Sequence, residues 1–315
     1  MDDAAIGTRP VAEVGHDQRG QWVVVLSAAE IAATLDADGR LDGLPFMPEM
    51  ARFCGMRLRI HRHAEKTCVE GLGLRRMGGT VLLEGARCDG AAHDGCARRC
   101  MMFWKEAWLR PVQADAPTPV AGLEQPWPGA LKTRDGELYV CQSTALGEAT
   151  ASMSKWSLGH LATDLRRGEI TPPRLANVVS RTLLNLARRK LGMDEIDALK
   201  GPGTERRRGR LNLQAGEWVR IKPVEQIQAT LDANGKNLGL AFEPEMKRYA
   251  GGVFQVEFLV DRIIQEETGV MSPLTHTVAL RDLVCQGICV KNCPRSNPLY
   301  WRESWLERVE APHAA

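Results

Sequence analysis

The sequence lacks a long apolar run. Among its 315 residues no stretch of about 18 consecutive apolar side chains occurs, which is roughly the length that a helix needs to cross a bilayer. Residues 1–5 are acidic and lack the apolar core of a secretory signal. We therefore predict a cytoplasmic protein without a membrane partner.

The chain also lacks a strong net charge and the common catalytic motifs. Its formal net charge is +2, so no overall field favours nucleic acid, and any basic surface is local. The sequence contains no glycine-rich phosphate loop, no Gly-x-Ser-x-Gly and no His-Glu-x-x-His. Nothing in it therefore points to a nucleotide-binding enzyme, a serine hydrolase or a zinc protease.

The Cys-x2-Cys knuckle that is typical of structural zinc sites is absent as well. The chain nevertheless has nine cysteines, and this odd number fits a full disulfide framework poorly. Cytosolic thiols stay reduced, so clustered cysteines there are more often metal ligands or redox groups than disulfides. The arrangement of the cysteines is therefore the main evidence on function.

The densest thiol cluster lies within residues 88–100, where three cysteines and His93 fall within thirteen residues. With one cysteine upstream they supply four thiolates, which suits both an iron–sulfur cluster and zinc. We predict a 4Fe–4S cluster, with zinc as the alternative, on Cys68, Cys88, Cys96 and Cys100. His93 would be a donor to a ligand or an alternative ligand. The competing interpretation is a group of ordinary buried or surface thiols.

A second cluster contains Cys285, Cys289 and Cys293 at Cys-x3-Cys-x3-Cys spacing. Three thiolates leave one coordination position for His276, Cys141 or an exogenous ligand. An open position on a metal is what catalysis requires. The alternative is a structural or degenerate site without metal. We expect one or two centres per chain.

The chain contains an internal repeat. Residues 20–55 align with residues 216–251 without a gap, at a constant offset of 196 residues, and residues 103–109 match residues 300–306. We therefore predict a duplication. The predicted parts are a polar leader (1–19), repeat one (20–112), a proline-rich and then helical connector (113–215), repeat two (216–310) and a tail (311–315).

Apolar alternation and regular turns predict a mainly β protein with a helical connector, an α+β chain of two small β-barrels. Each repeat opens with Gly-x-Trp-Val and closes with Trp-x-Glu-x-Trp-Leu or its near copy, on a short helical turn that plugs the barrel. This frame resembles the SH3-like barrel of nitrile hydratase beta subunits, which implies two SH3-like barrels. The catalytic metal of nitrile hydratase lies on its other subunit, in a Cys-x-x-Cys-Ser-Cys motif absent here, so the resemblance implies no activity.

Four local elements are predicted around these features. Ser27 and Glu30 form a capping box before a helix over residues 28–35. In the connector, residues 137–142 have the pattern of a strand, residues 156–165 that of a helix, and Thr171 precedes a longer helix that starts at Pro172.

Together these features favour a cytoplasmic iron–sulfur protein that acts in electron transfer or in a cluster-dependent biosynthetic step, with a protein redox partner. One alternative is a zinc-stabilised SH3-like module that binds a protein or nucleic acid. The basic run available for nucleic acid comprises Arg206, Arg207, Arg208 and Arg210. The other alternative is an accessory or partner subunit of a metalloenzyme.

Overall fold

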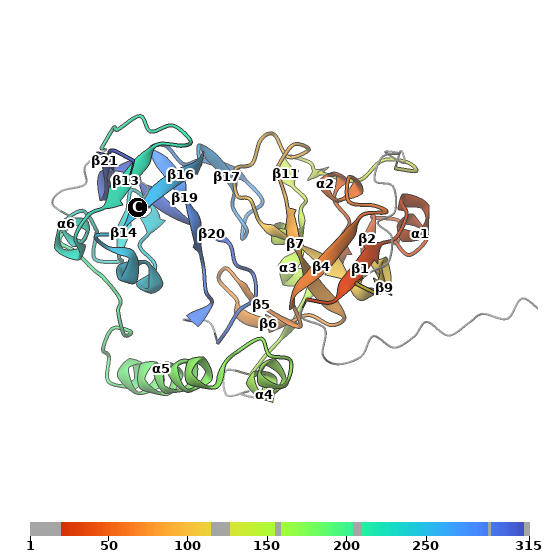
Figure 1. Ribbon diagram of the computed structural model, residues 1–315, viewed down its shortest axis with the longest axis horizontal. Coiled ribbons are helices and arrows are strands. Elements are labelled where there is room, and N and C mark those ends of the chain that lie inside the picture. Colours follow the sequence, from red (N-terminus) through yellow and green to blue (C-terminus); the bar gives the residue numbers. More distant parts are fainter. Residues whose placement is uncertain (1–19, 115–126, 155–158, 204–208, 289–290, 312–315) are drawn as a thin grey trace, which may run out of the picture.

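The computed structural model describes residues 20–114, 127–154, 159–203, 209–288 and 291–311. The fold is mainly β, as predicted, and its two five-stranded curled sheets lie side by side (Figure 1). We call the first sheet with its loops the N-terminal half-barrel (residues 20–112) and the second the C-terminal half-barrel (residues 216–309).

The two sheets have the same strand order and are antiparallel throughout. The N-terminal sheet has the order β8-β7-β4-β1-β9, and the C-terminal sheet has the order β20-β19-β16-β13-β21. The first comprises β1 (Trp22–Val25), β4 (Arg57–His63), β7 (Thr80–Arg87), β8 (Met101–Lys105) and β9 (Leu109–Val112). The second comprises β13 (Trp218–Ile221), β16 (Val253–Leu259), β19 (Thr277–Val284), β20 (Pro298–Arg302) and β21 (Leu306–Val309).

Register and packing agree between the sheets as well. Trp22 lies opposite Val112, and Trp218 lies opposite Val309. The predicted closing turns are the 3₁₀ helices η1 (Glu106–Trp108) and η4 (Glu303–Trp305). Their tryptophans are fully buried in the two cores, so the predicted short turns and the burial of these side chains are confirmed.

Each plug is held by the same set of side chains. In the first core, Phe46 packs edge-on against Trp108, whose indole Nε1 donates to the Thr34 hydroxyl at 3.0 Å. In the second core, the corresponding contacts are made by Phe242, Trp305 and Thr230, with a hydrogen bond of 2.9 Å. Burial of an indole usually requires such a partner for its N–H group.

Short elements complete each half-barrel. The helix α1 (Ala28–Ala32) begins with the predicted capping box of Ser27 and Glu30. The N-terminal half-barrel adds β2 (Arg40–Leu41), β3 (Leu44–Pro45), α2 (Pro48–Ala51), β5 (Lys66–Val69) and β6 (Gly73–Arg76). The C-terminal one adds α6 (Val224–Ala229), β14 (Lys236–Asn237), β15 (Leu240–Ala241), η2 (Pro244–Tyr249), β17 (Arg262–Ile264) and β18 (Met271–Pro273).

The segment between the half-barrels contains three helices and three two-residue strands in its described part. It contains β10 (Arg134–Asp135), β11 (Leu138–Tyr139), α3 (Gln142–Ala149), β12 (Ala151–Ser152), α4 (Gly159–Arg166) and α5 (Pro172–Lys190). In Figure 1, α4 and α5 lie along the lower edge, whereas α3 lies close to the N-terminal sheet. The predicted helix from Pro172 is confirmed, with Thr171 at the N-cap but without a side-chain capping bond. Of the predicted helix over 156–165, residues 156–158 lie outside the described residues, and the rest is helical in α4.

The predicted strand over residues 137–142 is wrong in its second half. Only Leu138 and Tyr139 pair in a strand, and Cys141 is the N-cap of α3. The backbone N–H of Cys141 donates to the Thr144 hydroxyl at 3.0 Å, which turns the chain into the helix. This turn carries Cys141 toward the thiols of the first cluster.

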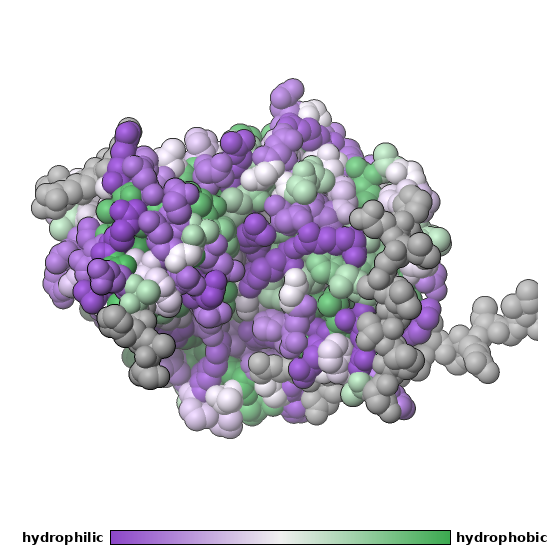
Figure 2. All heavy atoms as spheres, turned by 45° about the horizontal axis from the view of Figure 1, so that its top comes forward, coloured by the Kyte–Doolittle hydropathy of each residue, from purple (hydrophilic) through white to green (hydrophobic). Residues whose placement is uncertain are grey.

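Hydrophilic side chains cover much of the face seen in Figure 2, with smaller apolar areas between them. None of the helices in the described ranges has the length and apolar character needed to cross a membrane.

Candidate thiol site between the half-barrels

The two cysteine clusters occupy corresponding loops. One follows β7 and the other follows β19, and a backbone hydrogen bond closes each loop at its base. Cys88 N–H donates to the Cys100 carbonyl at 2.9 Å, and Cys285 N–H donates to the Asn297 carbonyl at 2.8 Å. The spacing of the cysteines therefore reflects a loop geometry that the two half-barrels share.

A glycine makes the tight turn in each loop possible. Gly90 and Gly287 have φ values of +72° and +68°, in the left-handed region. A Cβ atom at Gly90 would collide with the backbone of Cys96, and one at Gly287 would collide with that of Cys293. Only glycine avoids both the strain and the collision. The two glycines therefore allow the loop backbone to pack against Cys96 and Cys293, which sets the positions of these cysteines.

Each loop docks onto the opposite half-barrel. Ile264, at the end of β17, donates its N–H to the Cys96 sulfur at 3.4 Å. Cys68, in β5, donates its N–H to the Cys293 sulfur at 3.2 Å. The two contacts are reciprocal, so a cysteine from each half-barrel lies at the interface.

Two buried arginines reinforce this exchange. Arg98 donates to the Ile264 carbonyl at 2.9 Å, and Arg295 donates to the Cys68 carbonyl at 2.9 Å. Arg295 also pairs with the buried carboxylate of Glu266 at 2.7 Å. Burial would lower the pKa of Arg295, but Glu266 and nearby sulfur groups raise it, so its guanidinium is charged.

The sulfurs of Cys68 and Cys293 are in direct contact, with Sγ atoms 3.2 Å apart. Burial would raise the pKa of Cys293, but hydrogen bonds from the Cys68 thiol and from backbone N–H groups outweigh it, and Arg295 adds to their effect. The pKa of Cys293 is therefore lowered. The pKa of Cys68 is raised by its hydrogen bond with Cys293 and by burial. The pair can hold one proton and one negative charge.

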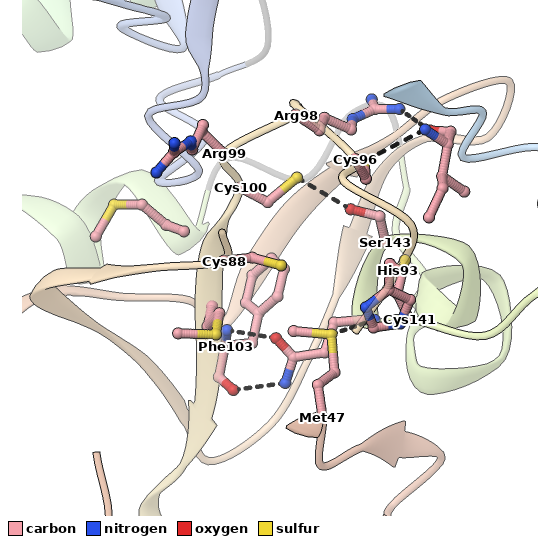
Figure 3. A pocket seen from close by; sticks show the side chains of 14 residues that line it. Met47, Cys88, His93, Cys96, Arg98, Arg99, Cys100, Phe103, Cys141 and Ser143 are labelled. Atoms are coloured by element: carbon pink, nitrogen blue, oxygen red, sulfur yellow. Dashed lines mark hydrogen bonds between the residues drawn. The ribbon is translucent and has the colours of Figure 1, made fainter. Parts of the chain in front are cut away.

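A small cavity of about 30 Å³ lies between the first loop, β8 and the start of α3 (Figure 3). The residues that line it include Cys88, Cys96, Cys100 and Cys141. The Cys100 sulfur is 3.4 Å from the Ser143 hydroxyl. Two separate segments, residues 88–100 and the start of α3, thus bring four thiols around one space.

Cys141 reaches this cavity because α3 is fastened to β8. The amide of Gln142 donates to the Phe103 carbonyl at 2.8 Å and accepts from the Phe103 N–H at 2.8 Å. As a metal ligand, Cys141 was expected from the sequence at the second cluster and not at the first. The signal that could have placed it is the Thr144 hydroxyl three residues on, which favours a helix start.

His93 is buried with both ring nitrogens in hydrogen bonds. Its Nδ1 is 2.6 Å from Glu49 Oε1, and its Nε2 is 3.0 Å from the Val140 carbonyl. Burial would lower the pKa of His93, but the hydrogen bond to Glu49 outweighs burial and raises that pKa. Burial would raise the pKa of Glu49, but the same hydrogen bond outweighs burial there and lowers it. The two form an imidazolium–carboxylate pair, and His93 would have to give up one hydrogen bond to ligate a metal.

Burial keeps the thiols of Cys88, Cys96 and Cys141 protonated. It raises the pKa of Cys88 and Cys96, and it raises that of Cys141 to about 11. Within the described ranges no group of three or more His, Cys, Asp or Glu side chains has the geometry of a metal site. Coordination would therefore require the thiols to turn into the cavity and to lose their protons to the metal.

The remaining predicted site residues are placed as follows. Cys68 is not part of the cavity lining and lies against Cys293, across the interface. Cys285 is half-buried, and burial and Glu245 raise its pKa. Cys289 and Arg206–Arg208 lie outside the described residues, whereas Arg210 is exposed.

His276 cannot complete the second cluster in this fold, which corrects that expectation. It precedes β19 and Cys285 follows it. A strand of eight residues separates the two positions by roughly 25 Å, because each residue adds about 3.3 Å. His276 lies instead near Glu303, with Nδ1 3.8 Å from the carboxylate.

No family model matches the chain, and neither a curated protein nor a solved structure is significantly similar to it.

Proposed function

We propose that this chain is a cysteine-ligated metalloprotein that acts in cytoplasmic redox chemistry, as an electron carrier or in a cluster-dependent biosynthetic step. The observation that carries the proposal is the single cavity lined by Cys88, Cys96, Cys100 and Cys141. Four thiolates are the ligand set of iron–sulfur clusters and of many zinc sites. Compared with the set expected from sequence, Cys141 takes the place of Cys68.

The size of the cavity bears on which metal it holds. Its volume of about 30 Å³ is room for one or two small groups, since one water needs roughly 10–15 Å³. This volume is closer to what a single iron or zinc ion needs. A 4Fe–4S cluster, the cofactor that the sequence favours, would require the loop over residues 88–100 to open.

The closed character of the site bears on its role. If four protein thiolates fill a tetrahedral shell, no position is left for a substrate. Such a centre suits electron transfer or structural support, and substrate chemistry would belong to a second centre at Cys285, Cys289 and Cys293. If the ion is zinc, the small cavity favours the second candidate function, a metal-stabilised module that binds a macromolecular partner.

We also propose that the two half-barrels are SH3-like barrels that arose by duplication. Their common strand order, matching register and reciprocal loop contacts support this origin.

The deciding experiment is metal analysis of anaerobically purified full-length protein with an ultraviolet–visible spectrum. Iron with matching sulfide and an absorbance near 400 nm that dithionite bleaches would establish a cluster. Iron without sulfide indicates a single redox ion, and stoichiometric zinc in a colourless protein selects the binding module. More than one centre per chain would support the second cluster. Protein that binds none of these metals after reconstitution overturns the proposal.

Variants locate the centre. Cys96→Ala and Cys141→Ala are each expected to lose most of the bound metal, because each removes one of four ligands. Cys54→Ala is the matched control, since Cys54 is half-buried but does not line the cavity. If Cys141→Ala retains metal while Cys68→Ala loses it, the ligand set is the one expected from sequence and the cavity assignment is wrong.

A further inference from the structure

The contact between Cys68 and Cys293 is distinct from the cavity. Their sulfurs are 3.2 Å apart and come from different half-barrels, 225 residues apart in the sequence. A disulfide bond is about 2.05 Å long, so the two atoms need to approach by only about 1 Å. Among the cysteines that the structure describes, no other pair makes a sulfur–sulfur hydrogen bond.

We propose that Cys68 and Cys293 form a redox-active dithiol, which closes to a disulfide between the two half-barrels by exchange with a low-molecular-weight disulfide. The proposal does not depend on the metal centre, because neither cysteine lines the four-thiol cavity. It does exclude both residues from holding a metal while the disulfide is closed.

The surroundings align the two sulfurs. The backbone N–H of Cys68 donates to the Cys293 sulfur at 3.2 Å, and Arg295 holds the Cys68 carbonyl at 2.9 Å. Arg295 is in turn fixed by two bonds to Glu266, at 3.0 and 2.7 Å. Because these groups bind the backbone and the sulfur together, the side chains are held in contact before any oxidation.

The reciprocal contact shows that this pairing is specific to one side. Cys96 occupies the place of Cys293 in the first loop and accepts a backbone N–H in the same way. Its partner is Ile264, which offers no second sulfur. The docking of a loop cysteine is therefore common to both sides, whereas among the described cysteines a pair with touching sulfurs is found at Cys68 and Cys293 alone.

Exposure determines the order of the exchange. Cys68 is half-buried and Cys293 is buried, so an external disulfide RSSR meets Cys68 first. Cys68 passes its proton to the Cys293 sulfur, and the Cys68 thiolate attacks one sulfur of RSSR, forms Cys68–S–S–R and releases RS⁻, which takes up the proton from Cys293. The Cys293 thiolate then attacks Cys68 Sγ and releases the second RS⁻, which takes up a proton from solvent. The pair loses two electrons and the one proton that it held, and RSSR becomes two RSH.

The bond would tie the two half-barrels together covalently. Thiol–disulfide exchange is reversible, so an excess of RSH reopens it. The site is therefore a reversible covalent link between the parts of the molecule that carry the two cysteine clusters.

The test is incubation of reduced full-length protein with glutathione buffers of increasing oxidised fraction, followed by alkylation, proteolysis and peptide mass spectrometry. The expected product is a peptide pair joined through Cys68 and Cys293, with a loss of two free thiols that reduced glutathione reverses. Metal content is measured on the same samples, which separates this outcome from the fate of the metal centre.

Single variants test the order of attack. Cys293→Ser is expected to trap glutathione on Cys68, because no resolving sulfur remains, whereas Cys68→Ser is expected to leave Cys293 unmodified. Cys54→Ser, outside the pair, should form the same cross-link as wild type. Absence of the cross-link in folded wild-type protein, or stable glutathione on wild-type Cys68 in its place, would overturn the proposal.

Discussion

At the scale of single residues, the buried ion pair of His93 and Glu49 shows how the first thiol loop is held. Both groups are nearly inaccessible to solvent, and the pair joins the loop to α2. The remaining ring nitrogen of His93 binds the Val140 carbonyl, just before α3. One imidazolium thus connects the three segments that surround the cavity.

This pair predicts a pH-dependent stability. The raised pKa of His93 gives a contribution that is present below its unfolded pKa and is lost as pH rises through the folded value. The lowered pKa of Glu49 gives one that is present above its unfolded pKa and is lost as pH falls. The stabilisation is therefore largest between about pH 4.5 and pH 6.5, the ordinary values for these two groups.

The measurement is urea unfolding of wild type and His93→Gln at pH 5.5 and pH 8.5. At pH 5.5 the variant should cost roughly 3 kcal/mol, because Glu49 is left as a buried carboxylate without its cation. At pH 8.5 the difference should be smaller. The control is His276→Gln, at a half-buried histidine on the other half-barrel. An equal cost at both pH values would mean that His93 packs as a neutral ring.

At the scale of elements, the sequence predicted what depends on near neighbours. Ser27 and Glu30 are three residues apart, and their capping box forms as expected. The tryptophans of η1 and η4 are buried as expected, since a large apolar side chain at a regular place in each repeat has few alternatives. The strand predicted over residues 137–142 was wrong at Cys141, because strand pairing ends at Tyr139 and α3 begins after Cys141. The Gln142 amide then holds α3 against β8.

The Gln142 amide should therefore contribute strongly to the attachment of α3. Gln142→Ala leaves the Phe103 N–H and carbonyl without their partner in a buried place, which is expected to cost about 2–4 kcal/mol. It should also expose Cys141 to alkylating reagents in the folded protein. Hydrogen exchange and iodoacetamide labelling measure the two effects. Gln226→Ala, on the exposed face of α6, is the matched control. Unchanged Cys141 labelling would show that other contacts hold α3 in place.

At the scale of the whole molecule, the repeat was visible in the sequence but the way the two half-barrels meet was not. An offset of 196 residues identifies equivalent positions, yet it does not say which half-barrel each loop will touch. Cys68 was assigned to the nearest cluster in the sequence, and the fold places it against Cys293 of the other half-barrel. Contacts across 225 residues depend on how the half-barrels pack, which no local pattern encodes.

That packing centres on a buried charge network, which leads to a prediction about the whole molecule. Glu266 accepts from Arg295 at 2.7 Å and lies 3.6 Å from Arg98. It also accepts the backbone N–H of Glu70 from the opposite half-barrel at 3.0 Å. Arg295→Met removes the cation that is bonded most directly to Glu266 and should destabilise the interface by roughly 3–5 kcal/mol, because a buried carboxylate loses its main partner.

The double variant Arg295→Met/Glu266→Gln separates this charge effect from lost packing. Removing both charges should recover a large part of the stability lost in Arg295→Met, since no buried carboxylate then lacks its cation. Unfolding free energies of the wild type, the two single variants and the double variant give the coupling. If the two single effects simply add, Arg295 and Glu266 do not act as a unit. A double-variant cost that is smaller than their sum would mean that the two charges stabilise the interface as a pair.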